Sequence, residues 1–248
     1  MARRVVSILF TAGAMACIGS AAPAVLSCPI DTLTNYTAPG FTCFIGDRTF
    51  ANFVLDLNST QGLGTATPAL ADSVLVLPNP AGDSGFAFQA AFEASGALAR
   101  ESLSIGYTGT APQGDPFGEA RLSLNGASVT GAATITAALA VCQDGSFSGL
   151  AAPLTCSSGQ AINPELAPQI TNANLAATAA LVFTPVTKLG VVVQIQLTGA
   201  AFGSATASSF ENDVPASETG SWVMAAAGLA LFVRRKLRTD FRKGRVRQ

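Results

Sequence analysis

The sequence predicts an all-β body, a single antiparallel β-sandwich of about nine strands with a jelly-roll or immunoglobulin-like topology. Apolar residues recur at every second position in short runs, which is the period of a half-buried strand. Gly, Pro, Asn and Asp interrupt these runs at the spacing of sandwich strands. Segments typical of protein export flank this body, so we divide the chain into residues 1–24, 25–213 and 214–248.

The expected strands follow one another along the body. The run 74–77 is apolar on both faces and ends before Pro78, which predicts a central strand that stops at this residue. We expect further strands at 134–141, 175–183, 191–198 and 203–210, and no helix before Gly220. Alternation places three sets of side chains on inward faces: Phe53, Leu55 and Leu57; Phe86, Phe88, Ala90 and Phe92; and Leu103, Ile105 and Tyr107.

One tight hairpin is expected around Asn125-Gly126, which lies between two alternating arms. Asn-Gly is the preferred dipeptide of the type I′ turn. A two-residue loop pairs Leu124 with Ala127 and Leu122 with Val129, and both pairs fall on one face.

The amino-terminal segment has the layout of a secretory signal peptide. Arg3 and Arg4 precede the apolar run 5–18, and Ala22 and Ala24 supply the small residues that signal peptidase reads. Val25 is therefore the predicted first residue of the mature chain. The alternative is a lipoprotein with a lipobox at 25–28, although Leu26 stands where that motif has a small residue.

The carboxyl-terminal segment has three parts in the order that stops a chain in a bilayer: a turn-forming motif at 214–218, an apolar run at 220–233 and a basic tail at 234–248. The run of 14 residues makes a helix of roughly 21 Å, against a hydrocarbon core of about 30 Å. It predicts a short transmembrane helix suited to transient anchoring. A buried helix of a soluble protein is the alternative.

This order of parts resembles the sorting signal of PEP-CTERM proteins, which a membrane protease called exosortase processes. The family pattern is Val-Pro-Glu-Pro, a hydrophobic helix and arginines. Here the processing motif reads Val214, Pro215, Ala216, Ser217 and Glu218, with Ala and Ser in place of the family's Glu and second Pro, and the basic stop is formed by Arg234, Arg235 and Lys236. The resemblance implies export and cleavage near 214–218.

A second resemblance lies at the start of the body. Cys43-Phe-Ile-Gly-Asp-Arg-Thr-Phe50, with residues 32–36 before it and Phe53 after it, is similar to the mature start of a group of PEP-CTERM proteins. The stretches 104–107 and 122–126 are also similar in placement. The resemblance implies an exported, surface-associated β-rich protein and brings no catalytic residues with it.

The charge of the body differs sharply from that of its flanks. Residues 25–213 hold four basic residues and thirteen acids, a net charge of 4 − 13 = −9. An acidic body does not bind nucleic acid through its phosphates. Basic residues at both flanks predict that the ends stay cytoplasmic and that the body is translocated.

Four of the five cysteines remain after removal of residues 1–24, because Cys17 lies in the signal peptide. They allow three connectivities, of which pairing between neighbours, Cys28 with Cys43 and Cys142 with Cys156, is the simplest. Each bond would contribute roughly 3 kcal/mol on chain-entropy grounds. The chain has no histidine and no C-x-x-C spacing, so we expect neither a zinc site nor a cofactor.

Some short motifs are typical of catalysis or ion binding. Gly82-Asp-Ser-Gly85 resembles the nucleophile segment of chymotrypsin-like proteases, but without histidine it is better explained as a turn. The stretches 144–146 and 52–58 offer oxygen ligands for calcium without a known loop spacing, and 35–37 and 58–60 match glycosylation sequons. Four carboxylates of glycosidase type are better explained as solvated strand edges and loops: Glu93, Glu101, Asp115 and Glu119.

The sequence therefore predicts a non-enzymatic exported protein of the cell envelope or an extracellular polysaccharide matrix. Its expected partners are signal peptidase and exosortase during export, the membrane for a time, and extracellular polysaccharide. The alternative is a glycan-binding β-sandwich module on the cell surface. The body has two tyrosines and no tryptophan to form an aromatic platform. A hydrolase is the third hypothesis.

Overall fold

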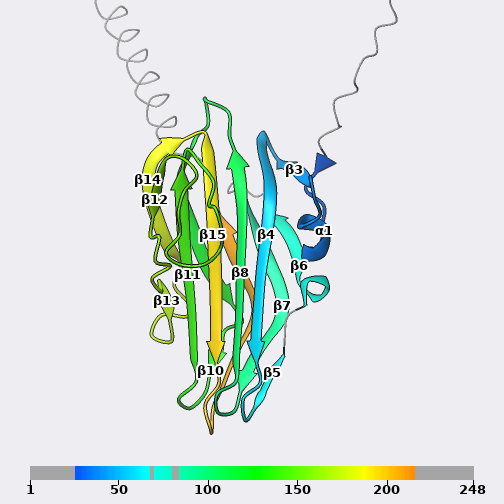
Figure 1. The fold of residues 1–248 in the computed structure, drawn as a ribbon, viewed down its shortest axis with the longest axis vertical. Helices are drawn as coiled ribbons and strands as arrows, with labels where there is room; N and C mark the ends of the chain where they lie inside the picture. Colours follow the sequence, from blue (N-terminus) through cyan, green and yellow to red (C-terminus); the bar gives the residue numbers. More distant parts are fainter. Residues whose placement is uncertain (1–25, 68–69, 80–83, 216–248) are drawn as a thin grey trace, which may run out of the picture.

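The structure, a computed structural model, describes residues 26–67, 70–79 and 84–215. Two eight-stranded sheets pack face to face as a sandwich (Figure 1). Every strand pair is antiparallel except β1 with β3. The predicted all-β sandwich is therefore confirmed.

The first sheet runs in the order β1 (Leu26–Ser27), β3 (Thr42–Ile45), β4 (Arg48–Thr60), β8 (Arg100–Thr110), β15 (Lys188–Thr198), β11 (Thr134–Gln143) and β12 (Gln160–Ile162), and β13 (Ile170–Thr171) also pairs with β11. The second sheet runs in the order β14 (Ala179–Val186), β9 (Phe117–Asn125), β16 (Ser204–Asp213), β7 (Gly85–Ser95), β6 (Leu75–Asn79) and β2 (Asp31–Thr32), with β10 (Ser128–Val129) on β16 and β5 (Thr65–Thr67) on β7. Two short helical turns, α1 (Leu33–Tyr36) and the 3₁₀ turn η1 (Ala71–Ser73), lie beside β2 and β6.

The inward faces are those that the alternation predicted. Phe53 on β4, Phe88 on β7 and Ile105 on β8 are buried, whereas Val54 between two inward residues is 48% exposed. The strands are more numerous than the nine expected, because many are pieces of two to five residues. Pieces this short carry too few residues for a period to be recognised.

The predicted Asn125-Gly126 hairpin is wrong. β9 and β10 do not pair with each other; both pair with β16, one after the other. Gly126 has the positive φ of +60° that was expected. It lies at a break between β9 and β10, which follow each other along the same side of β16, and it does not reverse the chain. β16 is ten residues long and offers a continuous row of partners to both pieces.

Three smaller expectations also need correction. β6 runs through Pro78 to Asn79 and lies next to the edge, where only the two residues of β2 flank it, so Pro78 needs no ladder hydrogen bond on that side. β14 begins at Ala179 and not at Leu175. The four-residue helix α1 was not expected, and it buries Leu33 and Tyr36.

Aromatic side chains fill the space between the sheets. Phe50 of the first sheet meets Phe86 of the second edge to face, with 5.0 Å between ring centroids. Tyr107 stacks on Phe53 at 5.4 Å. Such pairs contribute about 0.5–1.5 kcal/mol beyond the area they bury. The core therefore combines large rings with buried leucine, isoleucine, valine and alanine side chains.

One polar link crosses this core. The Tyr107 hydroxyl of the first sheet donates to Oδ1 of Asn212, a fully buried residue of the second sheet. The Asn212 amide in turn donates to the carbonyl of Arg121 at 2.6 Å. Both polar groups are paired, which removes the penalty of burying them.

Strand β4 begins at the upper end of the sandwich in Figure 1, and its first residue, Arg48, is 2% exposed. Its guanidinium donates to the carbonyl oxygen of Val214 and, at 3.1 Å, to a carboxylate oxygen of Asp115. It also lies over the ring of Phe117, 4.8 Å from the centroid. This residue joins the start of β4 to the end of the described chain.

We predict that Arg48→Ala lowers the free energy of unfolding by about 3 kcal/mol, because it removes charge-assisted hydrogen bonds and packing at a buried site. Guanidinium unfolding measures this. The matched control is Arg100→Ala, which removes an exposed arginine and should change stability by less than about 0.5 kcal/mol. Equal effects of the two substitutions would show that the Arg48 contacts do not hold this end.

A second prediction concerns alkaline pH. Burial, reinforced by Asp31, raises the pKa of Tyr36 above its usual value, and burial with Asp213 does the same for Tyr107. The unfolded chain loses these protons above pH ~10 while the folded chain keeps them. The associated stability is thus complete below pH ~10 and is lost as the pH rises further.

Tyrosinate absorbance tests this directly, since the chain has two tyrosines. We expect neither to ionise near pH ~10 in the folded protein, and both to ionise together with the loss of β-type circular dichroism. A denatured sample provides the reference titration. Ionisation at the usual pKa with the circular dichroism unchanged would contradict the burial of both rings.

Candidate functional site

The outer face of the first sheet carries an apolar patch that a long loop covers. Ala138 and Ala140 of β11 and Val192 of β15 point away from the main core and are nevertheless buried. Leu154 and Leu166, from the chain between β11 and β13, pack on them. These residues form a second, smaller core outside the sandwich.

The covering loop is closed by the disulfide between Cys142 and Cys156, whose Cα atoms are 5.7 Å apart. Just after this disulfide, the Ser157 amide donates to the Ser146 carbonyl at 2.7 Å. The other disulfide joins Cys28 to Cys43, with Cα atoms 4.7 Å apart. Both are the pairs predicted from the spacing of the cysteines.

Two glycines let the loop approach the sheet. A Cβ atom on Gly190 of β15 would lie 2.9 Å from the Cα of Ser146. A Cβ on Gly106 of β8 would lie 2.7 Å from a methyl of Leu150 and 2.9 Å from a methyl of Val54. Any other residue at position 190 would push the loop backbone away from β15, whereas at position 106 the Leu150 and Val54 side chains would have to move.

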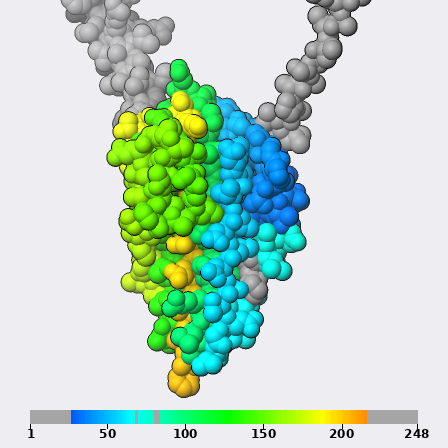
Figure 2. All heavy atoms as spheres, in the orientation of Figure 1, coloured from blue at the N-terminus to red at the C-terminus, as the bar shows by residue number. Residues whose placement is uncertain are grey.

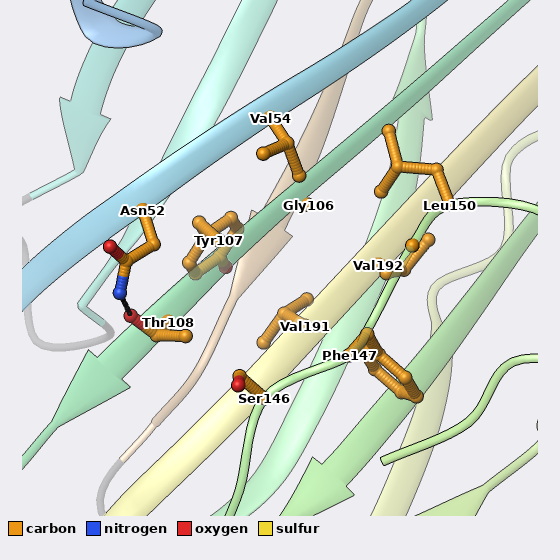
Figure 3. A pocket seen from close by; sticks show the side chains of 11 residues that line it. Asn52, Val54, Gly106, Tyr107, Thr108, Ser146, Phe147, Leu150, Val191 and Val192 are labelled. Carbon is orange, nitrogen blue, oxygen red and sulfur yellow. Dashed lines mark hydrogen bonds between the residues drawn. The ribbon is translucent and has the colours of Figure 1, made fainter. Parts of the chain in front are cut away.

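A pocket of about 140 Å³ remains between this loop and the strands β4, β8 and β15 (Figure 3). On one side Asn52 donates from its amide to the Thr108 hydroxyl at 3.0 Å. Asn52 has a φ of +56° at a bulge where β4 slips against β8. The described lining residues are Asn52, Val54, Gly106, Tyr107, Thr108, Ser146, Phe147, Gly149, Leu150, Val191 and Val192.

The pocket combines apolar walls with neutral hydrogen-bonding groups. Figure 3 shows Asn52 and Thr108 grouped on one side, Val54 and Leu150 along another, and Phe147 across the opening from Asn52. Among the described lining residues Tyr107 alone is titratable, and its hydroxyl is bonded to Asn212. Such a pocket suits a small neutral ligand with hydroxyl groups and offers no general acid or base.

The four carboxylates considered for hydrolysis do not meet in one place, although Glu93 of β7 lies next to Glu101. Glu101 is buried at the start of β8 and accepts a hydrogen bond from the Glu93 amide at 3.2 Å. Asp115 lies beyond the other end of β8, paired with Arg48, and so stands roughly 30 Å from Glu101. Glu119 pairs with Arg121 at 3.0 Å. Glycosidase pairs are about 5–9.5 Å apart.

Other short motifs fall on ordinary structural positions. Ser84 directly precedes β7, and its carbonyl accepts the Val214 amide at 2.9 Å. Asp144 lies at the base of the disulfide-closed loop with a φ of +56°. Asn35 lies in α1, and its amide donates to Asp31 at 2.7 Å. Within the described ranges no three His, Cys, Asp or Glu side chains gather so that they could hold a metal ion.

Of the predicted sorting motif, the structure describes Val214 and Pro215, and both are buried against the body. No helix in the described part of the chain is long and apolar enough to cross a membrane. The remaining predictions lie outside the described residues: cleavage after Ala22 and Ala24 before Val25, the motif residues Ala216, Ser217 and Glu218, the helix 220–233, and the basic stop Arg234, Arg235 and Lys236.

The pocket was not predicted from the sequence, although a signal was present. Residues 137–141 and 191–193 are apolar at every position, which indicates strands covered on both faces. The run 74–77 has the same pattern, yet Leu75 within it is 36% exposed, so the pattern alone does not locate a covered face. The cysteine pair that follows residues 137–141 marks the loop that provides the cover.

No protein-family model and no curated protein matches this chain. Among solved structures, a carbohydrate-binding module in complex with β-1,4-galactotriose aligns over 64% of this chain and 86% of its own, with 13% identity and a TM-score of 0.26. The enzymatically active domain of bacteriophage CBA120 tailspike protein 4 aligns over 69% of this chain and 20% of its own, with 12% identity and a TM-score of 0.28. Scores this low carry no information about the ligand or the activity of this chain.

Proposed function

We propose that this protein is a non-enzymatic, exported component of the cell envelope or an extracellular polysaccharide matrix. The observation that carries the proposal is the pair of disulfides, Cys28–Cys43 and Cys142–Cys156. Disulfides form and persist in oxidising compartments outside the cytoplasm. The export segments at both ends of the sequence agree with this location.

The arrangement of side chains supports a binding or structural role. Of the carboxylates considered for hydrolysis, Glu101 and Asp115 lie at opposite ends of β8, and Glu101, beside Glu93, is buried. The pocket on the first sheet contains amide, hydroxyl and apolar groups and no available acid or base. The chain therefore presents to its partners a rigid surface that two disulfides hold in place.

Sorting by an exosortase-type system is part of the same proposal. Val214 and Pro215 are packed on the body, and the Val214 carbonyl is held by Arg48. A protease needs an extended and open segment, so cleavage should fall after Pro215. The released product would then keep the Arg48 contact intact.

We predict that the surface or secreted form begins at Val25, carries both disulfides and lacks the basic tail. Intact-mass measurement with and without reduction tests all three features. The matched variant replaces Arg234, Arg235 and Lys236 with glutamine, which should reduce release because the cationic stop is lost. Recovery of a reduced, cytoplasmic chain that keeps both ends would refute the location and the sorting together.

A second candidate function, glycan binding, is favoured by the pocket beneath the disulfide-closed loop. Its volume of about 140 Å³ and its Asn52, Thr108 and Ser146 groups suit one neutral sugar residue. The partly buried Phe147 could pack against the apolar face of such a ring. The net charge of −9 over residues 25–213 disfavours anionic saccharides.

We predict weak binding of neutral oligosaccharides, with affinity lowered roughly 10-fold by Phe147→Ala, since the lost packing is worth about 1.5 kcal/mol. Gly106→Val should abolish binding by filling the pocket. Titration calorimetry with neutral and anionic oligosaccharides makes the measurement. Val182→Ala, at an exposed position on β14, is the control. Binding that survives Gly106→Val would place the ligand elsewhere.

A further inference from the structure

Four loops meet at the end of the sandwich opposite Arg48, the lower end in Figure 1. They are residues 61–64 after β4, 96–99 after β7, 130–133 before β11 and 199–203 after β15. We call this end the tip. The segment 199–203 forms its lowest point in Figure 2.

Backbone hydrogen bonds lock these loops together. The Leu63 amide donates to the Ala97 carbonyl at 2.9 Å, and the Gly199 amide donates to the Ala99 carbonyl at 2.8 Å. A Cβ atom on Gly131 would lie 2.6 Å from the carbonyl oxygen of Phe202. The tip is thus a single close-packed unit and not a set of separate loops.

Three large apolar side chains project from this unit into solvent. Phe202 is 97% exposed, Leu63 is 83% exposed and Leu98 is 64% exposed. Leu98 also has a φ of +64°, a backbone conformation that a leucine rarely adopts. Strained backbone of this kind persists only where the surrounding structure imposes it. The loops therefore hold these side chains outward.

The tip carries no charge, although the body as a whole is acidic. Its loops read Gln-Gly-Leu-Gly, Gly-Ala-Leu-Ala, Thr-Gly-Ala-Ala and Gly-Ala-Ala-Phe-Gly, without an acid or a base. Directly behind them the hydroxyls of Thr65 and Ser95 pair at 2.8 Å, and those of Thr130 and Ser204 pair at 3.1 Å. Thr130 is the first residue of its loop, and the exposed Arg100 directly follows the loop 96–99. The apolar projection is thus followed by a polar belt of hydroxyl groups that includes one exposed cation, Arg100.

We propose that the tip inserts into a lipid surface with neutral headgroups. The projecting side chains would enter the acyl region while the hydroxyl belt stays among the headgroups, as at other membrane interfaces. Neutral lipids are favoured because anionic ones would repel a body with a charge of −9. The proposal goes beyond the function proposed above and does not depend on it.

The area of the tip disfavours a second copy of the chain as the occupant. Three side chains expose on the order of 400 Å², since a single aromatic ring offers at least 150 Å². Two tips in contact would bury on the order of 800 Å², less than the roughly 1,000 Å² of a specific protein interface. A projecting shape with few polar groups is equally unsuited to polysaccharide.

The tip and the predicted tail cannot enter the same flat bilayer together. Residues 216–219 can span at most about 14 Å. β8 alone, with 11 residues, is about 36 Å long and separates the tip from the end where Val214 lies. The lipid surface that the tip contacts is thus a separate one, or the same one after release of the body.

The test places a tryptophan at the tip of the full-length chain, in which Trp222 is first replaced by Phe. The F202W variant and, as control, the V182W variant are mixed with vesicles of phosphatidylcholine that carry brominated acyl chains. We expect a blue-shifted, lipid-quenched emission from F202W and an unchanged, solvent-like emission from V182W. Adding Leu63→Ser or Leu98→Asn to F202W should raise the lipid concentration that gives half-maximal quenching roughly 10-fold.

Leu98→Asn suits the left-handed backbone at that position, so its loss of binding cannot be ascribed to misfolding. Two results would overturn the proposal. One is equal quenching, or none, at positions 202 and 182. The other is a blue shift of F202W without lipid that grows with protein concentration, which would show that the tip meets a second copy of the chain.

Discussion

The fold depends on filling the gap of about 10 Å between two sheets whose strands are rich in small residues. Alanine, glycine, serine and threonine cannot reach across that gap. Rings from both sheets do so instead, and Phe50 and Phe53 of the first sheet both meet Phe86 of the second, with ring centroids 5.0 and 5.3 Å apart. The hydrogen bond from Tyr107 to Asn212 fixes how one sheet lies over the other, because both groups are buried and each needs its partner.

The same gap explains which side chains lie at the two ends of the sandwich. The chain changes sheets between β4 and β5, between β7 and β8 and between β15 and β16, and it does so in loops of about four residues. Loops this short need glycine where φ is positive, as at Gly62 and Gly96. At the tip this leaves apolar side chains outside the core. At the other end Arg48 closes the sandwich over the ring of Phe117 and binds the Val214 carbonyl.

Much of this architecture could be predicted from the sequence because it depends on local patterns. The period of two correctly placed Phe53, Phe88 and Ile105 in the core, and short separations correctly paired the four cysteines. Strand pairing was harder to predict, since it depends on which long strand has unpaired backbone groups along one side. For that reason Asn125-Gly126, a strong local turn signal, became a break between β9 and β10 along β16.

The binding surfaces were less predictable because distant segments form them. The pocket needs Gly106 and Gly190, on two different strands, to lie under one loop, and neither glycine differs in sequence from the many others. The tip is similar, since Leu63, Leu98 and Phe202 are separated by 35 and 104 positions and meet only because four connections end at one place. Local sequence patterns do not specify such contacts between distant segments.

The three features lie on separate parts of one rigid body. The Arg48 contacts close one end, the loop-covered pocket lies on the outer face of the first sheet, and the tip forms the other end. Close packing between the sheets makes the body stiff, so a contact at the tip need not disturb the pocket. The proposed lipid contact and the proposed glycan contact thus use different parts of the sandwich and do not compete for one surface. The acidic character of the remaining surface would keep neighbouring copies apart.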